Sequence, residues 1–163
     1  MIPRDSRLWQ YLTPDQRSLA QDGEFLLQDS VRHKNEEPTD YSYVVFPFAK
    51  LYEGFLKELF LSLGILNDRD YRSDHYRIGK ALSPNLVGHL GRHSAYGQIE
   101  RRFGKDLADR LWLAWKNGRN LVFHYFPHNY RALTLEQAGS IVELLIHTME
   151  SAVEETSVQL RQP

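Results

Sequence analysis

The sequence predicts an all-α protein whose four main helices pack as an up-and-down bundle. Apolar residues recur at steps of three and four in the long segments, and two of these segments begin with a helix-capping pattern. The chain lacks the alternation of apolar and polar residues and the hairpin turns that are typical of strands. With 163 residues and no internal repeat, we expect one domain over 1–163, with loosely ordered ends at 1–12 and 157–163.

The first two main helices lie in the N-terminal half. Thr13 and Gln16 match a capping box, which predicts a helix that runs to about Lys34. The second helix covers residues 44–63 and is the most apolar in the chain, so we expect it to form the core. Because proline lacks an N–H group, Pro47 must lie near the first turn of this helix or kink it.

The other two main helices lie in the C-terminal half. A helical pattern begins at Lys105 and continues until Pro127 ends it. Thr134 and Gln137 repeat the capping box and predict a last helix that runs to about Glu155.

The segment between the second and third main helices is rich in charge, glycine and histidine. A connection as long as 67–104 is uncommon without structure, so we expect one short helix in 84–98 or a functional loop. From Arg69 to Arg119 the chain has eleven Lys or Arg against five Asp or Glu, although its net charge is −1. Such an excess is usually a solvated face, but it could also attract the backbone of a nucleic acid.

Composition excludes several other classes of protein. The chain has no cysteine, which excludes disulfides, thiolate metal sites and a cysteine nucleophile. It shows no signal-peptide pattern and no apolar stretch of the roughly 20 residues that a membrane helix needs. We therefore expect a cytoplasmic protein without a membrane partner.

A polar set interrupts the apolar stretch GRNLVFHYF at residues 118–126. On an α-helix, Asn120 and His124 would share a face one turn apart, and Arg119 would lie about 140° from His124, within reach of a long side chain. Gly118 leaves space for that arginine. The three polar groups can thus meet at one helix end.

These residue types suit the cleavage of a phosphodiester. A histidine side chain exchanges protons near neutral pH, and an arginine can hold two phosphate oxygens while charge develops on them. An asparagine can orient either neighbour. If the substrate is RNA, its own 2′-hydroxyl can be the nucleophile. The alternative is that Arg119, Asn120 and His124 only make the ordinary hydrogen bonds of a helix end.

The string from Arg119 to His124 resembles the R-x4–6-H signature of the HEPN superfamily, in which a polar residue such as Asn120 follows the arginine. HEPN domains are all-helical and carry this motif late in the chain, before a last helix. The Tyr- and Phe-rich neighbourhood is also similar to that of the HEPN-type ribonuclease toxins of the RnlA and LsoA family.

The resemblance implies a metal-independent endoribonuclease that needs no cofactor. His124 would be the general acid or base, Arg119 would bind the phosphate, and Asn120 would orient them. It further implies a homodimer with a composite active site, and a role as the toxin of a toxin–antitoxin or phage-defence system, held inactive by an antitoxin protein. The resemblance also leaves open a non-catalytic module for dimerisation, nucleotide binding or RNA binding.

One position departs from the family. Some HEPN toxins have R-x4-H-x-Y, with a tyrosine that an antitoxin enzyme modifies. Here that position is Phe126, and the tyrosine is the adjacent Tyr125. This form of control is therefore in doubt.

Five further residues are candidates for supporting substrate binding. Glu53 and Lys57 lie one turn apart on the second main helix and would either face the motif or form an exposed ion pair. Lys116 and Arg110 would attract the RNA backbone, unless Arg110 pairs with Asp106 instead. The fifth candidate is Tyr125.

A metal site is not expected. His89 and His93 have the spacing of metal ligands on a helix, but no carboxylate completes the pattern. Trp112 and Trp115 could stack on bases, although at helical spacing such residues are more often part of the core.

Overall fold

The computed structural model describes residues 1–33, 38–124 and 132–160, and these residues form helices and no β-strand. The predicted all-α class is therefore confirmed for this part of the chain. The α-helices are α1 (Arg7–Tyr11), α2 (Pro14–Arg32), α3 (Ser42–Ser62), α4 (Asp68–Tyr71), α5 (Ile78–Ala81), α6 (Val87–Leu90), α7 (Ala95–Phe103), α8 (Lys105–Trp115) and α9 (Leu135–Thr156). Two short 3₁₀ segments, η1 (Pro84–Leu86) and η2 (Gly91–His93), flank α6, and a π-helical turn, η3 (Lys116–Asn120), follows α8.

Both predicted capping boxes are present. The Thr13 hydroxyl accepts the Gln16 N–H at 3.2 Å, and the Gln16 side chain accepts the Thr13 N–H at 3.0 Å, so α2 begins as expected. Thr134 and Gln137 repeat the arrangement at the start of α9. Each pair satisfies two N–H groups that a helix start leaves without a helical partner.

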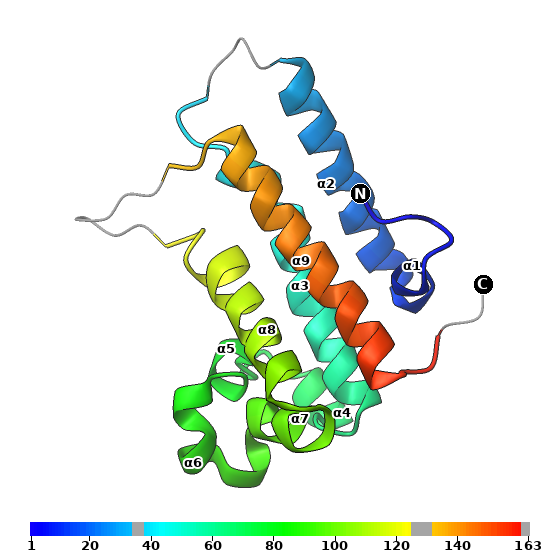
Figure 1. The fold of residues 1–163 in the computed structure, drawn as a ribbon, viewed down its shortest axis with the longest axis vertical. Helices are drawn as coiled ribbons and strands as arrows, with labels where there is room; N and C mark the ends of the chain where they lie inside the picture. Colours follow the sequence, from blue (N-terminus) through cyan, green and yellow to red (C-terminus); the bar gives the residue numbers. More distant parts are fainter. Residues whose placement is uncertain (34–37, 125–131, 161–163) are drawn as a thin grey trace.

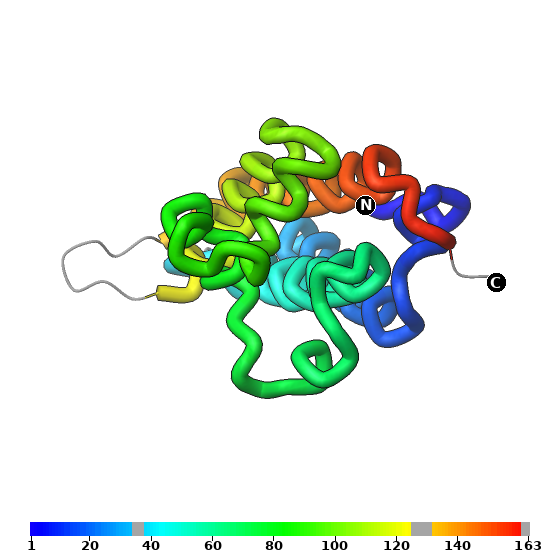
Figure 2. Tube along the Cα trace, turned by 90° about the horizontal axis from the view of Figure 1, so that it is seen from below, coloured from blue at the N-terminus to red at the C-terminus, as the bar shows by residue number. Residues whose placement is uncertain are grey.

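The long helices α2, α3, α8 and α9 run along the long axis of the molecule, and the chain direction alternates from each to the next (Figure 1). Helix α3 packs against both α2 and α9, and α8 packs against α9. The short helices α4 to α7 gather at one end, which is the end viewed in Figure 2. Among the described helices, none is both long enough and apolar enough to cross a lipid bilayer.

Helix α3 supplies much of the core, as its apolar pattern predicts. Its fully buried large side chains include Phe48, Leu51, Tyr52, Phe55, Leu56, Leu59 and Phe60. Pro47 lies in the second turn rather than the first. Because Pro47 has no N–H group, it cannot donate the helical hydrogen bond to the carbonyl of Tyr43, four residues earlier.

The predicted loose start at 1–12 is wrong for most of its length. Residues Arg7–Tyr11 form α1, and the Ser6 hydroxyl caps it by accepting the Trp9 N–H. Ile2, Leu8 and Leu12 are almost completely buried. At the other end Val158 is buried, and residues 161–163 lie outside the described chain. Burial of these apolar side chains fixes both segments against the main helices.

The segment 67–104 contains more helix than expected. A short helix does form within 84–98, at Val87–Leu90, but α7 is longer and was not predicted. Ser94 caps α7 by accepting the Gly97 N–H, and Gly104, with φ of 96°, separates α7 from α8. A left-handed φ suits glycine, so two helices follow one another where periodicity alone suggested a single late start.

Candidate functional site

The polar set lies on a widened helical turn rather than on a regular helix. Helix α8 ends at Trp115, and Lys116–Asn120 form the π-helical turn η3, in which the Leu121 N–H donates to the Lys116 carbonyl at 2.9 Å. The predicted continuation of the helix to Pro127 is therefore wrong for residues 121–124, which form a turn followed by a residue without regular secondary structure. Turns of this kind occur often at functional sites because they redirect side chains.

Close packing of η3 on α9 fixes the position of this turn. A Cβ atom on Gly118 would lie 2.6 Å from Cδ2 and 2.9 Å from Cγ of Leu145, which is fully buried. Only glycine therefore allows the turn to approach α9 this closely. From the sequence we expected Gly118 to leave space for Arg119. In the structure, the side chain that a Cβ atom on Gly118 would meet is that of Leu145.

Asn120 joins His124 to the turn. The His124 Nε2 atom lies 3.0 Å from Asn120 Oδ1. Because an amide oxygen only accepts, Nε2 donates the proton in this bond. Asn120 is half-buried and His124 is exposed. The predicted pairing of Asn120 with His124 is therefore present, although an α-helix does not carry it.

Glu53 and Trp115 hold Arg119. The Nε and Nη2 atoms of Arg119 lie 3.2 and 3.1 Å from the same Glu53 oxygen, Oε2. On another side the Arg119 Cζ atom lies 5.1 Å from the ring centroid of Trp115, within the range of a cation–π contact. The Arg119 side chain keeps 38% of its exposure. It is thus fixed in direction but open to solvent.

Trp115 is a core residue and not a surface for base stacking. It is 6% exposed, and a Cβ atom on Gly79 would lie 2.6 Å from its Nε1 atom. Helix α5 therefore supports the ring from one side while Arg119 contacts it from another. Trp112 is half-buried and packs against the same core.

A pocket of about 300 Å³ opens beside Arg119. Its walls come from α3, from η3 and from the turn after η3, and they carry both aromatic rings and charged groups. The lining residues are Phe46, Ala49, Lys50, Glu53, Arg119 and Phe123. Phe46 and Phe123 meet edge to face, with ring centroids 5.7 Å apart.

The supporting candidates divide into those at the site and those away from it. Glu53 faces the motif as predicted, and Lys57, one turn on, lines a neighbouring pocket of about 520 Å³ that also includes Glu53 and Lys50. Lys116 is exposed on η3. Tyr125 lies outside the described residues, as does Phe126.

Arg110 is engaged elsewhere. It pairs with Asp106 at 3.0 Å, as the alternative interpretation stated, and also with Glu155 at 2.6 Å. The hydrogen bond to Glu155 raises the pKa of the Arg110 guanidinium above its usual value. Glu155 is ten residues from Leu145 on α9, about 15 Å along the helix axis, and Leu145 is the residue that contacts η3.

The sequence interpretation missed Phe46, Lys50 and Phe123. Phe46 does carry a signal, because it is the apolar residue of α3 that falls off the buried stripe, and it is 55% exposed. Lys50 is one turn further along the same exposed face. Phe123 belongs to the apolar stretch at 118–126, but it is 38% exposed and borders the pocket.

Within residues 1–33, 38–124 and 132–160, no three His, Asp or Glu side chains gather closely enough to hold a metal ion. His89 lies on α6 and His93 on η2, where Arg92 donates to the His93 Nε2 atom at 3.3 Å. The two histidines therefore do not share one helix.

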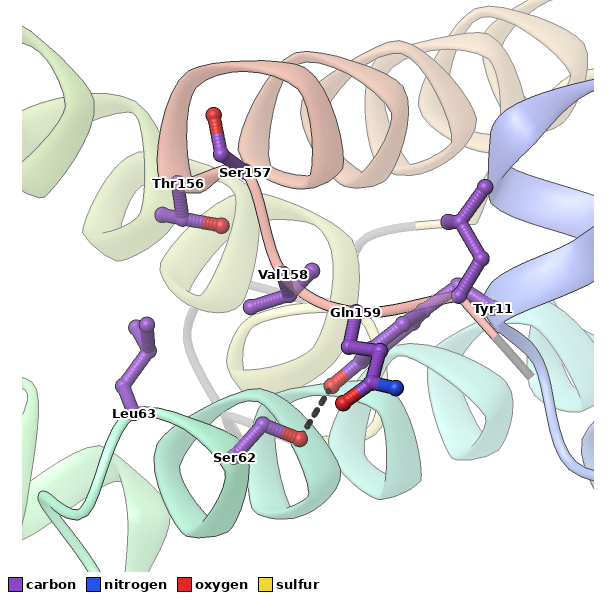
Figure 3. Close-up of a pocket in the computed structure, with 8 residues that line it drawn as sticks. Tyr11, Ser62, Leu63, Thr156, Ser157, Val158 and Gln159 are labelled. Carbon is purple, nitrogen blue, oxygen red and sulfur yellow. Dashed lines mark hydrogen bonds between the residues drawn. The ribbon is translucent and has the colours of Figure 1, made fainter.

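Another pocket, of about 520 Å³, lies where α1 meets the ends of α3 and α9. The hydroxyls of Tyr11 and Ser62 face each other there, 3.0 Å apart, beneath the segment that follows α9 (Figure 3). Its lining has no charged side chain, unlike the pocket beside Arg119. Its described lining therefore offers no charged group that could pair with a phosphate.

Comparisons with protein-family models, with curated proteins and with solved structures found no match to this chain.

Proposed function

We propose that this chain is a metal-independent endoribonuclease of the HEPN type, which cleaves RNA by attack of the 2′-hydroxyl. The observation that carries the proposal is the Asn120–His124 hydrogen bond, which links a proton-exchanging side chain to the residue directly after Arg119 on an accessible turn. Because Arg119 directly precedes Asn120, one short backbone segment positions all three groups.

Each residue has a defined task in the reaction. The 2′-oxygen bonds to the adjacent phosphorus, the bond from phosphorus to the 5′-oxygen breaks, and the products are a 2′,3′-cyclic phosphate and a 5′-hydroxyl. His124 accepts the proton of the 2′-hydroxyl or donates one to the leaving 5′-oxygen. The Nε–H group of Arg119 donates to Glu53, and other N–H groups of the guanidinium can bind phosphate oxygens as their charge increases.

The arrangement of the long helices supports the HEPN assignment. The alternating order α2, α3, α8 and α9, with the motif between the last two, is the order that the resemblance implies. The four-helix HEPN-like bundle is therefore part of this proposal. So are the homodimer, the antitoxin partner, and the role as a toxin or a phage-defence protein.

The direct test is an RNA cleavage assay in excess EDTA. Wild-type protein should produce cyclic phosphate ends, and a 2′-deoxy substrate should remain intact. His124→Ala should lose activity by a factor on the order of 100 to 10,000, whereas the matched variant His89→Ala should retain it. Absence of cleavage by the wild type, or equal cleavage by His124→Ala, would contradict the proposal.

A second candidate function is a non-catalytic module for dimerisation or for nucleotide or RNA binding. The Arg119–Glu53 ion pair favours it, because a charge that is already paired can have a purely structural role. This alternative predicts that Arg119→Ala lowers stability or dimerisation. The ribonuclease proposal predicts lost cleavage with the melting temperature largely retained, so thermal melting beside the cleavage assay separates the two.

A further inference from the structure

We propose that the pocket beside Arg119 binds one unpaired nucleobase of an RNA strand, which stacks on one of the rings of Phe46 and Phe123 and meets the other with its edge, while Lys50 and Arg119 contact the adjoining phosphates. This inference rests on the proposed ribonuclease function and gives it a substrate class, single-stranded RNA.

The two exposed rings carry the first step. Phe46 is 55% exposed and Phe123 is 38% exposed, and they come from α3 and from the turn after η3. Large apolar side chains that meet at the surface mark a binding site more often than isolated ones do. Because their planes are 87° apart, a flat partner can stack on one of the two rings and meet the other with its edge.

Charge narrows the class of partner. Among the described residues, two cations, Lys50 and Arg119, and one carboxylate, Glu53, line the pocket, so this part of the lining has one positive charge in excess. Glu53 is already paired with Arg119. A purely apolar partner would bring no negative charge to Lys50, whereas a nucleotide supplies both an aromatic face and a phosphate. Bases in single strands are recognised in this way, by stacking on aromatic side chains beside a basic groove.

Position narrows it further. Arg119 lines this pocket and is also the proposed phosphate ligand, so a base in the pocket would place its own phosphodiester next to the motif. In a duplex the base faces are already stacked on one another. The pocket therefore favours an unpaired strand over a paired one.

The test measures binding separately from cleavage. Wild-type protein is titrated into a short fluorescent RNA whose 2′-hydroxyls are all methylated, so that it cannot be cut, and anisotropy reports binding. Phe46→Ala and Phe123→Ala should each weaken the affinity for this RNA on the order of 5- to 100-fold. Phe46→Trp, which keeps an aromatic ring, should bind the RNA about as tightly as wild type. Phe25→Ala is the matched control, because Phe25 is 65% exposed on α2 and does not line this pocket. A blunt duplex, and the same strand with abasic sugars, should bind more weakly than the intact strand.

The outcomes separate this inference from the function on which it rests. If wild type cleaves RNA but Phe46→Ala binds the methylated strand as tightly as wild type, the inference is wrong and the ribonuclease proposal stands. If RNA is bound through the two rings but never cleaved, the ribonuclease proposal is wrong and the inference about the pocket stands. If Phe46→Ala instead changes the sedimentation of the protein and leaves RNA affinity unchanged, the rings belong to a protein interface and the inference is overturned.

Discussion

Arg119 on the turn after α8 and Glu53 in the middle of α3 form an ion pair in which Nε and Nη2 share one carboxylate oxygen, at 3.2 and 3.1 Å. The pair connects the proposed phosphate ligand to the core helix. Because both side chains are about one-third exposed, at 38% and 34%, solvent screens the interaction. Its value to the protein is therefore more in the direction it gives Arg119 than in stability.

Glu53→Gln tests this interpretation. The amide retains the shape but loses the charge, so the unfolding free energy should change by less than about 1 kcal/mol. A guanidinium that is no longer held in place should lower kcat on the order of 10- to 100-fold, with a smaller effect on KM. Steady-state cleavage and urea denaturation measure the two quantities. Glu143→Gln, an exposed change on α9, is the control. A large loss of stability together with unchanged kcat would assign Glu53 a structural role only.

Asn120→Ala should reveal its part in orienting His124. Because Asn120 accepts the Nε2 proton of His124, its loss removes one constraint on the orientation and tautomer of the ring. We expect a smaller loss of cleavage than in His124→Ala, with a shifted pH profile. The double variant should be no worse than His124→Ala alone, since the two residues act as a unit. Additive losses of activity would show that Asn120 acts independently.

Gly118→Ala should disturb the turn itself. The added methyl group would meet buried Leu145 at 2.6 Å, so either α9 or η3 must move. Overpacking of this kind costs about 1 to 3 kcal/mol of unfolding free energy. Gly139→Ala on α9 is the matched control, because nothing lies within 4 Å of its added Cβ, and alanine favours a helix over glycine there by about 0.5 to 1 kcal/mol. Opposite shifts in urea midpoints are expected, and equal shifts would contradict the close approach of η3 to α9.

Asp40 makes the unfolding free energy of the protein depend on pH in the acid range. Its Oδ1 atom accepts the N–H groups of Ser42 and Leu133 and the Ser42 hydroxyl, and so ties the residue before α9's cap to the start of α3. Burial raises the pKa of this carboxyl, but the bonds from Leu133 and Ser42 outweigh burial and lower it below its ordinary 3.8. The folded state then favours the charged form. The stabilisation is complete above the unfolded pKa and is lost as pH falls through the folded one.

Asp40→Ala should therefore lower the unfolding free energy by about 1 to 3 kcal/mol near neutral pH. The difference from wild type should narrow as pH falls below the ordinary value of 3.8. Urea denaturation at several pH values measures it, with Asp22→Ala as an exposed control on α2. A difference that stays constant into acid would mean that the charge of Asp40 is unimportant.

The sequence predicted the parts of the fold that depend on local chemistry. Both capping boxes, at Thr13 and Thr134, begin helices as expected, since two side-chain bonds within four residues decide each of them. The buried stripe of α3 follows in the same way from its spacing. Helix α1 escaped prediction because five residues show too little periodicity, and its burial depends on distant partners.

The candidate site was only partly predictable. Asn120 and His124 are four residues apart, so their contact follows from local spacing, but Arg119 finds its partner on a helix 66 positions earlier. From the sequence, Glu53 could either face the motif or form an exposed ion pair with Lys57. The spacing of the residues does not distinguish these two possibilities. The π-helical turn was not foreseen, because it depends on how closely Gly118 packs against Leu145.

That wide turn also affects how distant relatives of this chain would be recognised. It closes onto the sixth residue, Lys116 to Leu121, whereas an α turn closes onto the fifth. A homologue with one residue deleted between the tryptophan and the arginine could keep the R-x4-H string intact yet change the direction of the arginine relative to its glutamate. The number of residues from Trp115 to Arg119, together with a glutamate on the apolar helix, is therefore a more discriminating search pattern than the short motif alone.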